Sequence, residues 1–350
     1  QVGLQAAWEI DLFGGNRQAA QAAQERLDGA QARWHEARVS VAAETANTYV
    51  TLRTCEHLVV VADNDAKSRA ETARLAELSA QAGFTAPAVA ALARASAAEG
   101  SALATRQRTA CEVLVKALVA LSALPEPQLR QKLAVAWTEP SQANVLTVAS
   151  VPAQVLVQRP DVYQAEREVA AASADLGSAR AQRYPRLSLF GSIAAGSIRT
   201  GGVSTDLQTW SIGPLEVTLP IFDGGRRAAD VDAAQARYEE AAAFYAASVR
   251  QAVREVEEAL VTLESTRLRD EDARVAAENY RVSFVGTEAR YRSGLASLVE
   301  LEDARRNALV AETALVLLQR ERLAAWIALY RALGGGWERP DPATTTASRP

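Results

Sequence analysis

The stretch QVGLQAAWEIDLFGGNR, residues 1–17, joins a strand pattern to a helix pattern and so decides the fold. Apolar residues occupy its even positions from Val2 to Leu12, and polar residues such as Glu9 stand at odd positions. This period of two is typical of a strand with one apolar face and one polar face. After the glycine pair the chain continues for about 65 residues without proline, in an Ala-, Gln-, Glu- and Arg-rich composition that predicts a continuous helix.

The bulk composition excludes two classes of protein. The 350 residues carry a formal net charge of −4, which provides no large basic field, so we expect no nucleic acid partner. No apolar run reaches the roughly 18 residues of a membrane-spanning helix, which excludes a helical membrane protein but not the weaker strand signal of an outer-membrane barrel. Because the chain lacks Met and begins inside a strand pattern, we expect a processed or truncated chain.

The second half of the sequence repeats the first at an offset of 211 residues. At this offset Gly83 matches Gly294, Ala93-Arg94 matches Ala304-Arg305, and Ala117-Leu118 matches Ala328-Leu329. Each half therefore reads as a strand, a tight glycine turn, a very long helix, a second glycine-centred turn and a returning helix. We expect helices at residues 17–81, 86–124, 226–293 and 296–333.

Both long helices carry heptad-like spacing, which predicts lateral packing in a coiled-coil arrangement. In the first helix the spacing of seven joins Leu27, Trp34, Val41 and Thr48, with Ala23, Ala30 and Ala37 at companion positions. In the second the spacing alternates by four and three through Val249, Val253, Val256, Leu260 and Leu263. A helix of about 65 residues is about 100 Å long. The helices alone are equally compatible with a soluble coiled-coil rod.

Two further strand patterns precede the second long helix. The first, RLSLFGSIAAGSI, begins at Arg186 and alternates between apolar and polar or small residues. The second, WSIGPLEVTLPIF, changes parity at Gly213-Pro214, which predicts a bulge in the strand. Between the two patterns lies the Gly/Ser/Thr-rich stretch AAGSIRTGGVSTDLQT, which predicts a hairpin loop.

Strands of about ten residues with one apolar face suit an outer-membrane barrel. Three or four strands cannot close a barrel, and open sheet edges are not tolerated in lipid, so this interpretation requires an oligomer. If each repeat contributes one hairpin, a trimer supplies a twelve-stranded barrel, and the fourth strand of each chain is expected upstream of Gln1. The alternative is a small antiparallel sheet that caps a helical bundle.

The expected domain organisation follows the repeat. It comprises a barrel strand at 1–13, a helical hairpin at 17–124, a connecting equatorial segment with a helix at 125–184, a barrel hairpin at 185–222, a second helical hairpin at 226–333 and a disordered tail at 337–350. The tail is expected because the C-terminal residues are rich in Pro and Thr.

Three stretches resemble the TolC-type outer membrane factors, and most of all the NodT/OprM-like branch of efflux outer-membrane subunits. They are VPAQVLVQRPDVYQAEREVAAASADLGSARAQRYPRLSLFGSI (151–193), LEVTLPIFDGGRRAADVDAAQARYEEA (215–241) and YRSGLASLVELEDARRNALVAE (291–312). The resemblance implies a mainly α protomer with β strands, and a homotrimer with a barrel in the outer membrane on an α-helical barrel in the periplasm. The implied function is that of a passive exit duct, which works with a periplasmic adaptor protein and an inner-membrane pump.

The resemblance also assigns roles to the two helical turns. The turns match periplasmic tips where an adaptor docks, which gives as contact positions Gly83, Phe84, Thr85, Gly294, Leu295 and Ala296. Glycine in a hairpin turn also has a purely local use, because it adopts positive φ. Where the family has a latch arginine two residues after the tip glycine, this sequence has Ala296.

Three positions near the second tip match the closed pore entrance of the family: Glu300 and Asp303, just beyond the tip, and Tyr291, just before it. In a threefold assembly each acidic residue becomes a ring of three like charges, which favours cations. The alternative is an ordinary solvated helix face. The RPDV motif at 159–162 is interpreted as a helix start with no chemistry of its own.

Cys55 and Cys111 are the only cysteines, and both lie 28 residues from Gly83. Antiparallel helices that turn at Gly83 would place them at the same height, which predicts a disulfide in an oxidising periplasm or, alternatively, two buried free thiols. His35 and His57 have no partner at metal-ligand spacing, and no nucleophile, base and orienting group can be assembled. We therefore expect no enzyme, no cofactor and no metal site. The other functions left open are a coiled-coil scaffold without a channel and, within the family, type I protein secretion.

Overall fold

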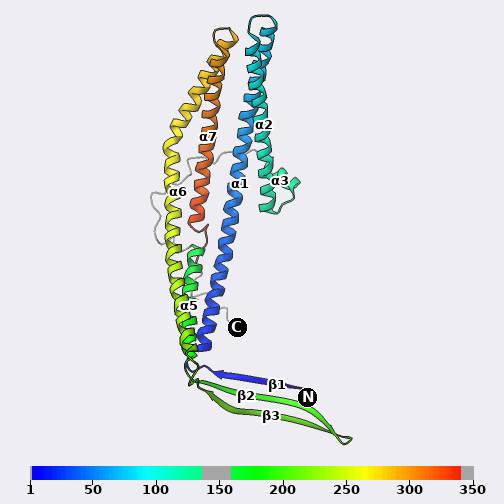
Figure 1. Ribbon diagram of the computed structural model, residues 1–350, viewed down its shortest axis with the longest axis vertical. Coiled ribbons are helices and arrows are strands. Elements are labelled where there is room, and N and C mark those ends of the chain that lie inside the picture. Colours follow the sequence, from blue (N-terminus) through cyan, green and yellow to red (C-terminus); the bar gives the residue numbers. More distant parts are fainter. Residues whose placement is uncertain (1, 136–158, 340–350) are drawn as a thin grey trace. The chain divides into compact units, whose positions relative to one another are not determined.

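The computed structural model describes residues 2–135 and 159–339 (Figure 1). The chain divides into two compact units, each of which draws on both halves of the sequence. The first unit contains residues 1–36, 156–252 and 337–350, and the second contains residues 37–155 and 253–336.

The first unit contains an antiparallel sheet in the order β1-β2-β3. Its strands are β1 (Val2–Ile10), β2 (Arg186–Thr200) and β3 (Val203–Thr218). Trp8 pairs with Leu189, and Leu189 pairs in turn with Leu215, so the apolar residues of all three strands share one face. The predicted alternation is thereby confirmed.

The register of β2 and β3 shifts at one point. Leu189 pairs with Leu215, but Gly191 pairs with Ile212, so β3 has one residue more than β2 between these pairs. The extra residue falls at Gly213-Pro214, where the bulge was predicted, and Gly213 adopts a φ of +99°. The bulge keeps Ile212 on the apolar face although it has the opposite parity to Leu215.

The hairpin between β2 and β3 corrects the predicted loop. The Gly/Ser/Thr-rich stretch does not form a long loop, because β2 runs to Thr200 and β3 begins at Val203. Only Gly201-Gly202 turns the chain, with φ values of +61° and +88°, as a two-residue hairpin turn requires. Serine and threonine in this stretch pair across the strands; the Oγ atoms of Ser197 and Ser204, for example, are 2.8 Å apart.

The two long helices are α1 (Gly15–Gln81) and α6 (Arg226–Arg292), each of 67 residues. They begin or end within two residues of the predicted bounds. The returning helices are α2 (Pro87–Ser122) and α7 (Leu298–Ala332), and the connecting segment contributes α3 (Glu126–Leu133) and α5 (Pro160–Ala181). In the part of the chain that is described, none of the helices combines the length and hydropathy needed to cross a membrane.

Alanine residues pack α1 against α5 in the first unit. Ala22 of α1 is buried with Ala171 and Ala174 of α5. The RPDV motif starts α5 as predicted: Pro160 is the first helical residue, and the Asp161 carboxylate accepts the N–H of Val162 at 2.9 Å.

The start of the predicted tail is ordered. The Trp337 ring lies 5.4 Å from the ring of Tyr163 on α5, and Arg339 forms an ion pair of 2.8 Å with Glu166. Aromatic and ionic contacts with α5 therefore correct the expectation of disorder for residues 337–339. The remainder of the predicted tail, 340–350, and residues 136–158 of the connecting segment lie outside the described residues.

Candidate functional site

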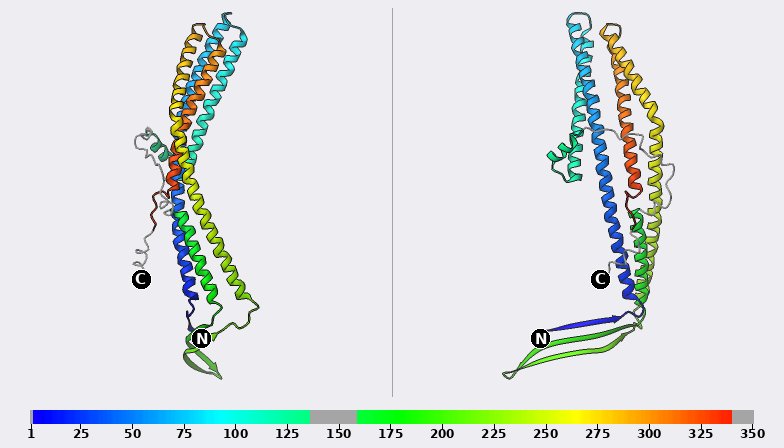
Figure 2. Two further views of the ribbon diagram at one scale, coloured as in Figure 1. Left: turned by 90° about the vertical axis from the view of Figure 1, so that its left-hand side faces the viewer. Right: turned by 180° about the vertical axis from the view of Figure 1, so that it is seen from behind.

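The second unit ends in two helical turns with the same geometry (Figure 2). In the turn between α1 and α2, the N–H of Phe84 donates to the carbonyl of Ser79 at 2.9 Å. In the turn between α6 and α7, the N–H of Leu295 donates to the carbonyl of Arg290 at 2.7 Å. Both bonds span five residues, which is the signature of a Schellman motif, so the sequence repeat is also a repeat of structure.

Both tips require glycine because of the backbone conformation, and a side chain there would not collide with neighbouring atoms. Gly83 has a φ of +80° and Gly294 a φ of +73°, and no atom lies within 4 Å of where a Cβ would stand. The residues after them expose large apolar side chains: Phe84 is 87% exposed and Leu295 71%. Thr85 is half-buried, and its hydroxyl lies 2.5 Å from that of Ser79.

The side chain of Ser297 caps the start of helix α7, directly after the second tip and the half-buried Ala296. The Ser297 hydroxyl accepts the N–H of Glu300 at 3.2 Å and donates to its carboxylate, also at 3.2 Å. Arg290 approaches the same carboxylate at 3.5 Å. Glu300 therefore has a local structural role besides the role that the family resemblance implies.

Glu300 and Asp303 lie three residues apart on α7 and thus on one face of the helix. Both side chains are more than half exposed, and Asp303 pairs with Arg306 at 3.2 Å. At the repeat offset, the matching positions of α2 are Val89 and Leu92. The acidic face consequently belongs to the second repeat alone.

Tyr291, the third predicted entrance residue, packs against the core below the tips. This core contains Ala73, Ala76, Ala93, Leu298 and Leu301. Burial raises the pKa of the Tyr291 hydroxyl, and the negative charge of Glu302 raises it further. The ring therefore joins the two hairpins instead of standing exposed beside the acidic pair.

Four charged residues that were not singled out in the sequence meet below this core. We call Asp65 and Arg69 of α1 together with Glu302 and Arg305 of α7 the charge cluster. Arg69 Nη1 lies 3.2 Å from Glu302 Oε2, and the Arg305 side chain is only 2% exposed. A sequence signal existed, because Arg305 continues the apolar spacing of Leu298 and Leu301 into a core position.

The structure joins Cys55 of α1 to Cys111 of α2 by a disulfide, with a Cα–Cα distance of 5.6 Å. The bond is buried in an apolar cluster with Leu52, Val115 and Leu118. We propose that the protein carries this bond.

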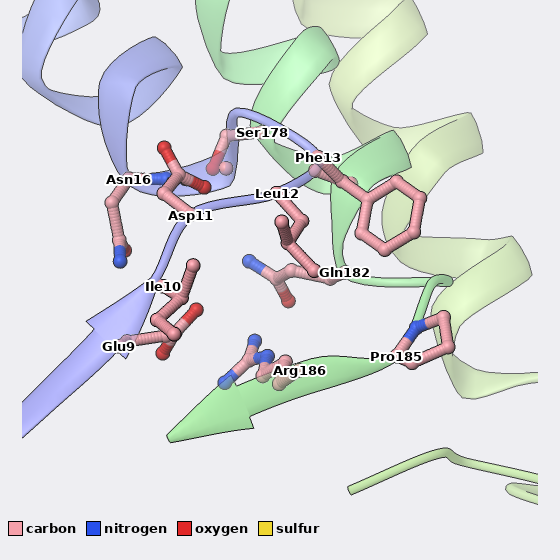
Figure 3. Close-up of a pocket in the computed structure, with 12 residues that line it drawn as sticks. Glu9, Ile10, Asp11, Leu12, Phe13, Asn16, Ser178, Gln182, Pro185 and Arg186 are labelled. Carbon is pink, nitrogen blue, oxygen red and sulfur yellow. Dashed lines mark hydrogen bonds between the residues drawn. The ribbon is translucent and has the colours of Figure 1, made fainter. Parts of the chain in front are cut away.

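Each long helix is capped by an aspartate at its junction with the sheet. Asp11 accepts the backbone N–H groups of Asn16 at 3.2 Å and Arg17 at 2.8 Å, beside a small pocket at the end of β1 (Figure 3). Asp223 accepts the N–H groups of Gly225 at 3.0 Å and Arg227 at 3.2 Å before α6. The bond from the Arg17 N–H is the main cause that lowers the pKa of Asp11, and the bond from the Arg227 N–H does the same for Asp223.

His35 lies in an aromatic group, with its ring 4.8 Å from Trp34 and 6.4 Å from Trp337. Among residues 2–135 and 159–339, no three His, Cys, Asp or Glu side chains come together closely enough to hold a metal ion.

Comparison with known proteins identifies the family. The model of the outer membrane efflux protein family matches residues 1–123 and 151–335. The chain is 37% identical to outer membrane protein OprJ of Pseudomonas aeruginosa over 188 aligned residues. The aligned residues are 53% of this chain and 39% of OprJ. It is 30% identical to nodulation protein T of Rhizobium leguminosarum bv. viciae over 348 aligned residues. This alignment covers 98% of the chain and 71% of that protein.

A solved structure confirms the predicted fold class. The CmeC outer membrane channel of Campylobacter jejuni is 26% identical, with a TM-score of 0.84 over 99% of this chain and 73% of that one. The chain therefore belongs to the outer membrane efflux protein family, and its place is the outer membrane of a Gram-negative bacterium.

Proposed function

We propose that the chain forms, as a homotrimer, a passive exit duct of a tripartite efflux system. The sheet contributes to a barrel in the outer membrane, and the helical hairpins form a periplasmic tunnel that is gated at its tips. A periplasmic adaptor protein docks at the tips, and an inner-membrane pump supplies the energy. The chain itself performs no chemistry on the solute.

The sheet is the observation that carries this proposal. It combines a continuous apolar face with two open edges, because β1 and β3 each pair only with β2 among the described residues. Lipid does not tolerate unpaired backbone groups, so both edges require strands from other copies of the chain or from its upstream part.

Exposed heptad positions on the long helices support lateral association of copies. The predicted seam of α1 is exposed at Leu27 (53%), Trp34 (59%) and Val41 (51%). On α6 a spacing of seven links further exposed residues, namely Val261 (68%), Leu268 (62%), Val275 (49%) and Val282 (66%). Neighbouring protomers would bury such seams in a coiled-coil arrangement.

The two tips support the proposed docking of an adaptor. Phe84 and Leu295 present large apolar side chains to solvent at equivalent positions of the two repeats. Exposed apolar groups of this kind mark interaction sites. A trimer would present six such positions in a ring, which suits an oligomeric partner with a matching apolar surface.

The test is the mass and the conductance of the protein after detergent extraction from outer membranes. We expect a trimer by light scattering and an ion-conducting pore in planar bilayers. A monomer or dimer that stays in water without detergent would overturn the barrel, the duct and the efflux role together.

A further inference from the structure

We propose that three arginines at the helix end of the sheet bind the phosphate groups of anionic phospholipids. We call them the basic collar: Arg17 in the first turn of α1, Arg183 two residues after the end of α5, and Arg226 at the start of α6. All three lie in the first unit. The inference rests on the proposed barrel, because a barrel places this end of the sheet at the periplasmic leaflet of the outer membrane.

The three arginines belong to one end of the sheet. Ile10 of β1 pairs with Leu187 of β2, and Leu187 pairs with Val217 of β3, so these residues form one row across the strands. Beyond this row the chain passes into the helices, and α1, α5 and α6 all meet the sheet at this end (Figure 1). The three junctions between strand and helix therefore lie at one level.

The same order of side chains occurs at each junction. From the strand towards the helix, an exposed aromatic residue comes first and an exposed arginine second. The pairs are Phe13 with Arg17, Tyr184 with Arg183, and Phe222 with Arg226. The first and third pairs are both spaced by four residues, so the sequence repeat preserves the pattern. Aromatic rings followed by basic groups are typical of the boundary between a bilayer and water.

The aromatic residues indicate where the lipid ends. The Phe222 side chain is 92% exposed, and the rings of Phe13 and Tyr184 stack with their centres 4.7 Å apart. Outer-membrane barrels carry girdles of such rings at both edges of their apolar band. The Arg17 side chain folds back towards them, because its Nη2 lies 3.4 Å from the point where a Cβ on Gly14 would stand. Its charge is therefore held beside the loop that carries Phe13.

The aspartates of the junctions are already engaged. The carboxylates of Asp11 and Asp223 each accept two backbone N–H groups at the start of a long helix. Asp223 also forms an ion pair of 3.0 Å with Arg227, which for this reason is not part of the collar. Among residues 2–135 and 159–339, no carboxylate forms an ion pair with any of the three collar arginines. The collar therefore offers positive charge to an external anion.

The glutamates near this end belong to the other face of the sheet. Glu9 and Glu216 both pair with Ser188, whose neighbours Leu187 and Leu189 belong to the apolar face. Arg186 has the parity of Ser188 and lies beside the pocket with Glu9 (Figure 3). It is therefore counted with the polar face and not with the collar.

The positions of Arg17 and Arg226 also oppose the dipoles of their helices. The start of a helix is partly positive, so a positive side chain in the first turn is unfavourable there and a negative one is favourable. Neither α1 nor α6 has an acidic residue in its first turn. Side chains that break a local rule in this way are expected at functional sites. A bound phosphate would complement both the arginines and the helix ends.

The apolar face favours a lipid phosphate over a free anion. Trp8, Leu189 and Leu215 lie in one row on this face, next to the junctions that carry the collar. A phospholipid would place its acyl chains on this face and its phosphate at the arginines. Because each protomer offers three positive charges, an anionic headgroup such as phosphatidylglycerol is favoured over a zwitterionic one.

The test counts the lipids that bind to the delipidated trimer in neutral detergent. Native mass spectrometry compares phosphatidylglycerol with phosphatidylcholine of the same acyl chains, and we expect the wild type to prefer phosphatidylglycerol. In R17Q/R183Q/R226Q this preference should disappear, with binding of phosphatidylglycerol roughly a hundredfold weaker, because each basic residue near an anionic surface contributes about fivefold. Unchanged binding in this variant would overturn the collar.

The matched control removes the same charge elsewhere in the first unit. R33Q/R237Q/R250Q replaces three exposed arginines farther along α1 and α6, which also form no ion pair with a described carboxylate. It should bind phosphatidylglycerol as the wild type does. R17K/R183K/R226K keeps the charge of the collar and should also retain binding. If R17Q/R183Q/R226Q does not assemble, Arg183→Gln alone should weaken binding roughly fivefold.

The outcomes separate the lipid from other anions and from the duct. Displacement of phosphatidylglycerol by millimolar inorganic phosphate would indicate a simple anion site and overturn the lipid as occupant. Preferential binding of lipopolysaccharide at the same arginines would overturn the assignment to the periplasmic leaflet. A wild-type trimer that conducts ions but binds both phospholipids equally would overturn the collar alone. Wild-type protein that forms neither a trimer nor a pore would remove the proposed function, and the collar with it.

Discussion

Cys55 and Cys111 are 56 residues apart in sequence, yet their Cα atoms lie 5.6 Å apart, and Gly83 stands exactly midway between them in the chain. The repeat offset places Thr266 and Arg322 at the matching positions of α6 and α7. The covalent link is therefore a property of the first hairpin, and the second hairpin depends on non-covalent contacts.

Removal of this link should destabilise the first hairpin. Cys55→Ser/Cys111→Ser should lower the free energy of unfolding by about 2–4 kcal/mol, because the unfolded chain regains the freedom of a long closed loop. Denaturant titration followed by circular dichroism measures the change. Wild-type protein treated with a reductant is the control and should match the variant. A thiol reagent that labels the denatured, non-reduced wild type would contradict the bond.

The helix caps at the sheet predict a dependence on pH. Because the folded-state pKa of Asp11 and of Asp223 lies below the ordinary value of 3.8, each carboxylate contributes stability that is complete above that value and is lost as the pH falls through the folded pKa. In D11N/D223N the amides do not titrate, so acid unfolding should depend less on this pH range. Circular dichroism at decreasing pH measures the helix content of the wild type and of D11N/D223N. An acid profile that is the same in D11N/D223N and in the wild type would contradict this role of the two caps.

The two faces of the sheet should respond oppositely to a charge. Leu189→Arg places a guanidinium on the apolar face and should cost about 2–4 kcal/mol at the middle of the bilayer. Ser188→Arg, one residue earlier, places it on the other face between Glu9 and Glu216, where cross-strand pairing is favourable. The fraction of each variant that inserts into lipid vesicles measures the two effects. Equal insertion of the two variants would contradict the assignment of the faces.

The acidic pair of α7 predicts a pattern of channel block. Glu300→Ala/Asp303→Ala should weaken block by a polyvalent cation such as spermine, because the rings of negative charge are lost. Arg306→Ala should strengthen it, because Arg306 partly neutralises Asp303 at 3.2 Å. Bilayer currents at increasing spermine concentration measure both changes. Unchanged block in the double variant would contradict the assignment of Glu300 and Asp303 to the pore.

Periodic features were predictable from the sequence because each residue carries part of the signal. The alternation around Trp8, the parity change at Gly213 and the matching turn at Gly294 all follow from local backbone geometry. The N-cap at Ser297 was not predicted, although a serine three residues before a glutamate is a local signal of a helix start.

The remaining features depend on partners far apart in the sequence. The helical spacing of Arg305 places it at a core position, but only the structure shows that Thr72 and Asp65 of α1 lie opposite it. The hairpin at Gly201 was misjudged for a related reason. Serine and threonine are common in loops, but two adjacent glycines shorten the turn and let those residues pair across strands.

One property of the sheet concerns the surroundings of the cell. The β2–β3 hairpin ends at the Gly201-Gly202 turn, where Arg199 of β2 pairs with Ser204 of β3 (Figure 1). Near this turn the face that is apolar lower down carries polar residues, among them Arg199 and Asp206. In the proposed barrel such a polar segment would stand outside the lipid, where antibodies and bacteriophages would meet it. Sequence change there would alter recognition by immune systems and viruses while leaving every residue of the two helical tips unchanged.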